Sequence, residues 1–282
     1  MKLAFSTLGC PAWSIDQVVD AAVTFGYAGV EWRLINGEVI DPLTNRVQVE
    51  QAVRACRQRG IAVCALDTSC RFNLPSPVAR AAQVADLLNW IDLAQAVQVP
   101  LLRVFGGANP AGDPGGGDEN VENGWVASAL QSAAPTAERA GVTIALETHD
   151  AFSSAWRTPA VLDAVDSTHI GAIWDSHHPY RVGETPEQVL AALGSRLVHV
   201  HVKDARRKAP GSNDWQLVLM GDGEVPVREQ LQLLAQKRYA GWVCVEWEKK
   251  WHPDLPDPEI ALPQHMAWLK RNLSPVEGAI GA

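Results

Sequence analysis

The sequence predicts an α/β protein built as a single closed (β/α)8 barrel, and three observations support this fold class. Short apolar runs recur eight times along the 282 residues. Segments of helical periodicity separate them. The connections are short, and the total length is typical of one such barrel. We therefore expect residues 1–282 to form one barrel domain, with a tail that begins after about residue 273.

The eight apolar runs are the predicted barrel strands. Runs of this length between turn-forming residues are typical of buried parallel strands. In chain order they are KLAFS (2–6), AGVEW (28–32), IAVCALD (61–67), PLLRVF (100–105), VTIALE (142–147), HIGAIWD (169–175), RLVHVHV (196–202) and GWVCVE (241–246).

Each strand is predicted to be followed by a helix. The segments with the clearest helical period are 15–25, 47–59, 78–97 and 227–238. Three hydroxyl residues precede predicted helix starts and can cap the first turn, namely Ser14, Thr158 and Thr185. The last two are each followed by a proline, which suits the first position of a helix.

A doubly wound open sheet is the alternative fold. Such a sheet usually carries a GxGxxG fingerprint after an early strand, whereas the first predicted loop reads TLGCPAWS. The closed barrel is therefore favoured. The stretch GGANPAGDPGGGD, residues 106–118, lies between the fourth strand and the fourth helix, so we predict a mobile loop there. It lacks the GK[ST] ending of a P-loop.

The composition excludes several classes of protein. With 47% hydrophobic and 20% charged residues, the chain can bury a large core, which excludes a disordered or fibrous protein. The net charge is −8, from 24 basic and 32 acidic residues, and the basic residues form no runs. The five cysteines form no CxxC pair, and no apolar run approaches the roughly 18 residues of a membrane span. We expect a cytoplasmic protein that binds a small molecule, and neither nucleic acid nor membrane.

Ligand-type residues close the last four predicted strands. In a (β/α)8 barrel, the carboxyl ends of the strands build the active site. These ends carry Glu147, Asp175, His201 and Glu246. Side chains alternate across a strand, so His199 and His201 are both expected to point into the barrel. The four strand-end residues should therefore converge on one volume.

Three carboxylates in one place need a positive partner. At about 4 Å and an effective dielectric of about 20, each pair of like charges costs roughly 4 kcal/mol. Protonation of one acid, the nearby Lys203, Arg206 or Arg207, or a divalent cation could compensate. One imidazole with three carboxylates suits Mn²⁺, Mg²⁺ or Co²⁺, and is compatible with Zn²⁺. We predict one divalent cation.

These motifs resemble the xylose isomerase-like barrels, a family of sugar-phosphate isomerases and epimerases that includes ketose 3-epimerases, hydroxypyruvate isomerases and inosose dehydratases. The resemblance extends from KLAFSTLG through GYAGVEWR to the final strand. It implies that ALETHD, IWDSHH, HVHVKD and CVEWE supply the metal ligands Glu147, Asp175, His201 and Glu246.

The epimerase branch of that family implies two substrate-binding residues. A histidine three residues after the metal aspartate falls on His178, and an arginine six residues after the metal histidine falls on Arg207. The second glutamate of that branch is replaced here by Ser153. This departure argues against a direct assignment as a ketose 3-epimerase.

Other residues near the strand ends are candidates for roles beside the cation. His149, Lys203 and Trp13 are candidates for substrate binding, although Lys203 could instead neutralise the site or be solvated, and Trp13 could belong to the core. His199 is expected to support a metal ligand, or to pack inside the barrel. The residues that close strands two to four either bind hydroxyls or pair within the barrel. They are Glu31, Asp67 and Arg103.

The predicted activity follows from the cation. A divalent ion that holds adjacent oxygens of a polyol or ketose stabilises the enediolate formed when the carbon between them loses a proton. Glu147 and Glu246 could remove and return that proton, which gives a sugar or sugar-phosphate isomerase or epimerase. Loss of a hydroxyl from the same intermediate gives a dehydratase like inosose dehydratase. The sequence is also compatible with an apurinic-site endonuclease-like hydrolase or a non-catalytic sugar-binding barrel. Barrels of this kind commonly pair, so a homodimer is a further expectation.

Overall fold

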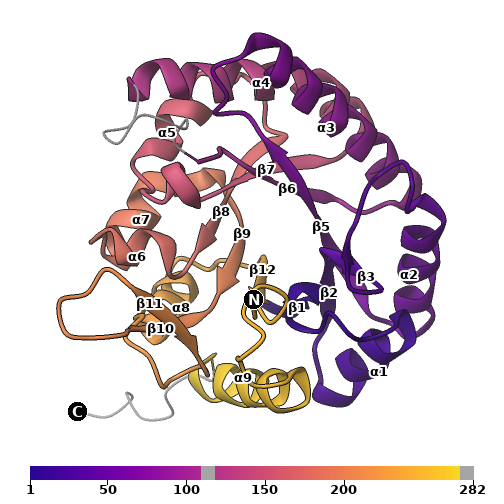
Figure 1. The fold of residues 1–282 in the computed structure, drawn as a ribbon, viewed down its shortest axis with the longest axis vertical. Coiled ribbons are helices and arrows are strands. Elements are labelled where there is room, and N and C mark those ends of the chain that lie inside the picture. The colour runs from indigo at the N-terminus through magenta and orange to yellow at the C-terminus, as the bar shows by residue number, and fades with distance from the viewer. Residues whose placement is uncertain (109–117, 274–282) are drawn as a thin grey trace.

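A computed structural model describes residues 1–108 and 118–273 of the chain. Eight parallel strands close into a barrel, so the predicted fold class is confirmed (Figure 1). Around the barrel the strands are β1 Lys2–Ser6, β2 Gly29–Trp32, β5 Ala62–Arg71, β6 Leu101–Phe105, β7 Thr143–Glu147, β8 Ile170–Asp175, β9 Leu197–Val202 and β12 Trp242–Val245. The eight predicted strands correspond to these eight.

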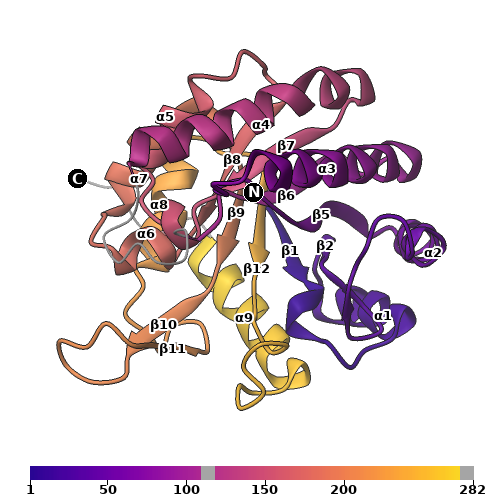
Figure 2. The ribbon, with the colours of Figure 1, turned by 45° about the horizontal axis from the view of Figure 1, so that its top comes forward.

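Helices surround the strands, as the two ribbon views show (Figures 1 and 2). They are α1 Ile15–Phe25, α2 Arg46–Gln58, α3 Pro77–Val97, α4 Glu119–Ala140, α5 Arg157–Leu162, α6 His178–Arg181, α7 Pro186–Leu193, α8 Val227–Gln236 and α9 Pro258–Leu273. Short 3₁₀ helices lie at Thr7–Gly9, Asp150–Phe152 and Gly194–Arg196. Most of the predicted mobile loop (106–118) and the predicted tail after 273 lie outside the described residues.

Two of the three predicted helix caps are confirmed. The hydroxyls of Ser14 and Thr185 each accept a hydrogen bond from the backbone N–H three residues on, and the glutamine there binds back to complete a capping box. The prediction at Thr158 was wrong, because α5 begins at Arg157 and leaves Thr158 buried inside it. Arg157 forms a buried ion pair with Glu122 of α4 at 2.5 Å, which anchors this earlier start.

Two antiparallel hairpins interrupt the alternation of strands and helices. The first joins β3 Leu34–Ile35 to β4 Glu38–Val39 after β2, and the second joins β10 Asp204–Arg207 to β11 Trp215–Val218 after β9. The helices predicted to follow these two barrel strands, α2 and α8, come after the hairpins. Between β3 and β4, Asn36 and Gly37 both have positive φ, which suits the tight turn of a hairpin.

Asp204 anchors the second hairpin. Its carboxylate accepts hydrogen bonds from the backbone N–H groups of Ala205, Gly221, Gly223 and Val225 at 2.8–3.2 Å. Since the hairpin follows the carboxyl end of β9, it extends the mouth of the barrel on the side of the predicted site (Figure 2).

The apolar core lies mainly between the strands and the surrounding helices, where Leu66, Trp90, Leu102 and Trp174 are buried. The inner side of the barrel carries buried polar groups instead, among them Glu31 and Arg103. Among the helices in the described part of the chain, none combines the length and the hydropathy required to cross a membrane.

Candidate metal centre

The structure brings the four predicted ligands together. One ligand atom each from Glu147, Asp175, His201 and Glu246 lies within 4.8 Å of the others. All four side chains are buried. The predicted convergence of the last four barrel strands on one volume is therefore observed.

Strand register explains this convergence. Asp175 of β8 and His201 of β9 are partners in the parallel pairing, and His201 is also the register partner of Cys244 in β12. Glu246 stands two residues beyond Cys244, so it points to the same inner face. Glu147 ends β7, next to β8 in the barrel.

His201 is the centre of a group of carboxylates. Its Nδ1 atom lies 2.8 Å from Glu147 Oε1 and 3.6 Å from Glu246 Oε1, and its Nε2 atom lies 3.0 Å from Glu31 Oε2. Burial lowers the pKa of His201, but the charges of Glu31, Glu147 and Glu246 outweigh burial and raise this pKa well above its ordinary value. The ring thus balances part of the negative charge.

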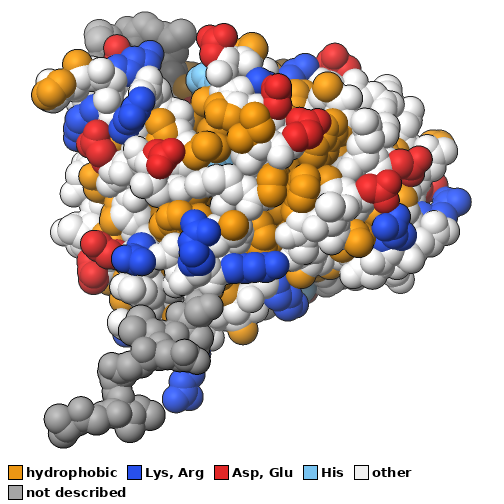
Figure 3. Space-filling view, turned by 90° about the horizontal axis from the view of Figure 1, so that it is seen from below, with side chains coloured by type: hydrophobic (Ala, Val, Ile, Leu, Met, Phe, Trp, Pro, Cys, Tyr) orange, Lys and Arg blue, Asp and Glu red, His pale blue; other side chains and the backbone are white. Residues whose placement is uncertain are grey.

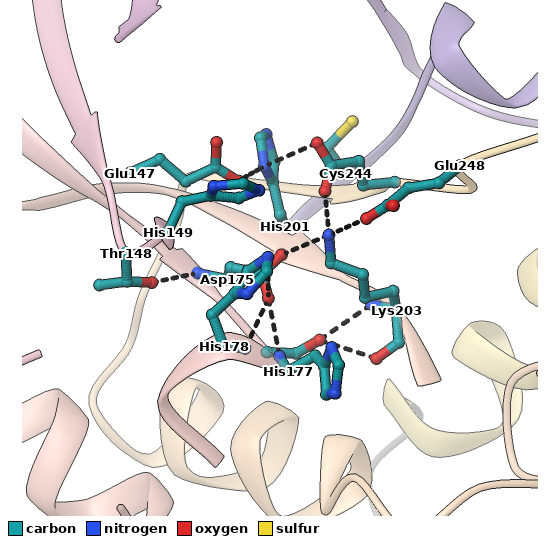
Figure 4. Close-up of polar contacts among 12 residues, drawn as sticks. Glu147, Thr148, His149, Asp175, His177, His178, His201, Lys203, Cys244 and Glu248 are labelled. Atoms are coloured by element: carbon teal, nitrogen blue, oxygen red, sulfur yellow. Dashed lines mark hydrogen bonds and ion pairs between the residues drawn. The ribbon is translucent and has the colours of Figure 1, made fainter. Parts of the chain in front are cut away.

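Lys203 is buried among three carboxylates rather than solvated. Its Nζ atom lies 3.1 Å from Asp175 Oδ2 and forms short contacts with Glu246 and Glu248 (Figure 4). Burial lowers the pKa of Lys203, but the three carboxylates raise it well above its usual range. Of the roles considered for this lysine, the contacts support neutralisation of the site.

The backbone around Asp175 holds its carboxylate in place. Oδ1 accepts hydrogen bonds from the N–H groups of His177 at 2.8 Å and His178 at 3.0 Å, and the Asp175 N–H donates to Thr148 Oγ1 at 2.9 Å. Burial raises the pKa of Asp175 to about 6, and the neighbouring glutamates act in the same direction. Oδ2 is left to face Lys203.

Glu147 is held in its charged form. Burial raises its pKa, but the charges of His201 and Arg103 outweigh burial and hold it well below the ordinary value. The Arg103 guanidinium lies 3.5 Å from Glu147 Oε2 and 3.5 Å from Asp67 Oδ2. Of the two roles considered for Arg103 and Asp67, the structure supports pairing inside the barrel.

Two predicted substrate-binding residues stand beside the four ligands. The rings of His149 and His178 lie 4.2 Å apart between centroids, and His178 Nε2 lies 4.0 Å from Asp175 Oδ1. Neither ring nitrogen of His178 has a hydrogen-bond partner within the described part of the chain. His178 also lines a cavity of about 920 Å³ at the barrel mouth, together with Trp215, Glu248 and others.

Two other predicted substrate-binding residues are directed elsewhere. The Arg207 guanidinium donates to the Ser212 carbonyl at 2.7 Å and lies over the Trp215 ring, 4.6 Å from its centroid. Trp13 Nε1 donates to Glu259 Oε1 at 2.9 Å. The structure brings neither residue to the four ligands. Arg206, one position before Arg207, lines the mouth cavity instead.

A comparison with protein families identifies the fold family. A family described as "Xylose isomerase-like TIM barrel" matches residues 19–272. The chain belongs to this family. The resemblance inferred from its strand-end motifs is thereby confirmed.

Among curated proteins, inosose dehydratases match one part of this chain. The enzyme of Clostridium botulinum is 26% identical over 119 residues, which cover 38% of this chain and 38% of the relative. The enzyme of Clostridium tetani is 29% identical over 132 residues, which cover 43% of this chain and 42% of the relative. The chain therefore matches well under half the length of these relatives.

Solved structures match almost the whole barrel. The IOLI protein with a zinc atom superposes with a TM-score of 0.80 at 16% identity, over 97% of this chain and 98% of that one. D-psicose 3-epimerase with D-fructose gives 0.75 at 12% identity, over 97% and 99%. The probable 3-DHS dehydratase AsbF of Bacillus anthracis gives 0.75 at 16% identity, over 96% and 99%. At these identities the likeness establishes the fold.

Proposed function

We propose that the protein is a divalent-metal-dependent enzyme that transfers a carbon-bound proton of a sugar or sugar phosphate and so isomerises or epimerises it. The observation that carries this proposal is the buried convergence of Glu147, Asp175, His201 and Glu246 at the barrel mouth. Neighbours of the same fold include D-psicose 3-epimerase, which supports a sugar as the substrate class.

The donor set suits a divalent cation. Glu147, Asp175 and Glu246 supply hard oxygen ligands and His201 supplies one nitrogen, which favours Mn²⁺, Mg²⁺ or Co²⁺ and is compatible with Zn²⁺. The zinc atom of the IOLI protein supports a cation in this fold. When bound, the ion would polarise adjacent substrate oxygens and make the carbon-bound proton between them more acidic.

Glu147 and Glu246 are the proposed acid–base pair. Glu147 ends β7 and is held ionised by His201 and Arg103, which is the protonation state that a general base requires. Glu246 follows β12 and contacts Lys203, whose ammonium group can stabilise the charge on its carboxylate. Return of the proton to the opposite face of the same carbon gives epimerisation, and return to the neighbouring carbon gives isomerisation.

The histidines at the mouth are proposed to orient the substrate. Burial lowers the pKa of His178 well below its ordinary value, which favours a neutral ring. With no partner for its nitrogens among the described residues, that ring can bind a hydroxyl group. The His149 ring lies against the His178 ring, with 4.2 Å between their centroids (Figure 4).

The decisive experiment measures exchange of carbon-bound hydrogen with solvent. Ketoses, aldoses and inososes are incubated with the protein and Mn²⁺ in deuterium oxide, and loss of the proton signal is followed by NMR. Glu147→Gln should abolish the exchange that the unaltered protein catalyses, because the amide cannot accept the proton. Glu122→Gln is the matched control, since Glu122 pairs with Arg157 away from this site. Exchange at the normal rate in Glu147→Gln would exclude Glu147 as the base.

A dehydratase is the second candidate, and the inosose dehydratase relatives favour it. The same proton abstraction followed by loss of a neighbouring hydroxyl would release water. Product mass after incubation with inososes separates the two outcomes, because isomerisation leaves the mass unchanged and dehydration reduces it by one water.

Hydrolysis of nucleic acid and sugar binding without catalysis have less support. An endonuclease-like hydrolase would need a basic groove for DNA, whereas the net charge of the chain is −8 and its basic residues form no runs. On the face seen from below Figure 1, acidic and basic side chains are interspersed (Figure 3). A non-catalytic sugar-binding barrel would bind sugars without any proton exchange. A homodimer and a cytoplasmic location stay predictions, the latter supported by five free cysteines.

A further inference from the structure

Glu31 is a buried carboxylate to which the proposed chemistry gives no role. It stands in β2, and its side chain reaches the two histidines of β9 inside the barrel. Its Oε2 atom accepts a hydrogen bond from His201 Nε2 at 3.0 Å, and His199 Nε2 lies 3.0 Å from the same oxygen. All three residues have no exposed surface.

The His201 ring therefore has two distinct sides. Nδ1 faces Glu147 at 2.8 Å and Glu246 at 3.6 Å, within the group of four proposed ligands. Nε2 faces Glu31. An imidazole that keeps its hydrogen on Nε2 offers a lone pair only at Nδ1, so the partner of Nε2 decides which nitrogen can bind a cation.

We propose that Glu31 is a positioning residue of the metal centre, which holds His201 with Nδ1 toward the cation. A half-turn of the His201 ring would put carbon where Nδ1 stands and would break the hydrogen bond to Glu31. The carboxylate thus opposes that rotation. This inference rests on the proposed function, because it takes the four-residue cation site as given.

A second cation held by Glu31, His199 and His201 is the competing explanation, since their ligand atoms also lie within 4.8 Å of one another. That arrangement would require one His201 ring to give up both ring hydrogens and bridge two cations. A hydrogen bond from Nε2 to Glu31 needs no such bridge, so the direct 3.0 Å contact favours positioning.

The test is a calorimetric titration of the metal-free full-length protein with Mn²⁺. The unaltered protein should bind one ion. Glu31→Leu should raise the Kd about 10- to 100-fold, and Glu31→Gln less, because its amide oxygen can still accept from Nε2. Glu122→Gln, which also removes a buried carboxylate, should leave the Kd unchanged. Circular dichroism checks that each variant is folded.

Nitrogen-15 NMR of the histidine rings reports directly which nitrogen of His201 carries the hydrogen. With Mg²⁺ bound, His201 should carry hydrogen on Nε2 and none on Nδ1, and this signature should survive in Glu31→Gln. If Glu31→Leu does not fold, the Glu31→Gln titration and this spectrum decide the question.

Three results would overturn the proposal. One is a folded Glu31→Leu variant with unchanged Mn²⁺ affinity, and another is a ring nitrogen signature with the hydrogen on Nδ1. The third is two bound ions in the unaltered protein that fall to one in Glu31→Leu, which would indicate a second cation site. Failure of the unaltered protein to bind Mn²⁺, Mg²⁺, Co²⁺ or Zn²⁺ would instead refute the proposed function on which the inference depends.

Discussion

Replacement of Lys203 by methionine should destabilise the metal-free protein and increase its affinity for a divalent cation. Lys203 is the buried ammonium group that contacts Asp175, Glu246 and Glu248. Methionine retains much of the aliphatic volume and removes the charge. Without the ammonium group, the three carboxylates repel one another and destabilise the metal-free protein. A bound cation is then no longer repelled by a positive charge beside its site.

The expected size of the effect follows from the contact distances. At 3.1 Å and an effective dielectric of about 20, the attraction between Nζ and Asp175 Oδ2 is about 5 kcal/mol before desolvation is counted. Removing one partner from a buried ion pair costs about 3–5 kcal/mol in measured cases. We therefore expect the free energy of unfolding to fall by about 3–5 kcal/mol in EDTA at pH 7.

The cation should reverse much of this loss. Removal of a positive charge beside the site should tighten Mn²⁺ binding at least about tenfold, which corresponds to about 1.4 kcal/mol. Urea unfolding in EDTA and in Mn²⁺ measures the free energy of unfolding without and with the cation, and calorimetry measures the Kd for Mn²⁺. Lys237→Met is the matched control, because Lys237 is exposed, and it should change either quantity little. The reasoning fails if Lys203→Met unfolds in EDTA at the normal midpoint, or if it binds Mn²⁺ more weakly.

Three further predictions concern residues outside the metal centre. Asp204→Ala should lower the free energy of unfolding by about 3 kcal/mol, because backbone N–H groups of the hairpin region lose a charged acceptor. Proteolysis within residues 215–225 should become faster, and an unchanged rate of cleavage would contradict this. Burial lowers the pKa of His265 to about 3, so the unfolded chain, with an ordinary value near 6.5, binds a proton more readily. Stability should therefore fall as the pH drops below about 6.5, and His265→Phe should reduce that slope by about 1.4 kcal/mol per pH unit in urea titrations; parallel profiles would refute this. Thr185→Ala should lower the free energy of unfolding by about 1 kcal/mol, and an unshifted urea midpoint would show that the capping box contributes nothing.

The barrel and the convergence of four polar strand-end residues could be predicted because both depend on short periodicities. A strand repeats every two residues, so a polar residue at a strand end has a defined face. Parallel strands in a closed barrel all end at one mouth, so Glu147, Asp175, His201 and Glu246 had to approach one another once the strand order was right. The hairpin β3–β4 has a different signal, the turn pair Asn36-Gly37, which strand and helix periodicity does not reveal.

Arg207 shows where a residue offset loses its predictive value. Its offset of six residues from His201 does not by itself fix the direction of its side chain, because the backbone of the segment after β9 determines that direction. Here that segment forms the hairpin β10–β11, which Asp204 ties to the loop at Gly221 and Gly223. The pairing of the hairpin directs Arg207 to Trp215 and the Ser212 carbonyl.

Sequence periodicity also does not predict which charged side chains pair with one another inside the barrel. Alternation places Glu31, Asp67 and Arg103 on the inner face, but it does not say which opposite charge each side chain reaches. That choice depends on side-chain length and on the strands that face one another across the interior. Glu31 contacts His201, 170 positions away, whereas Arg103 lies between Asp67 and Glu147. Since a buried charge without a partner is costly, these pairings inside the barrel contribute to the stability of the fold.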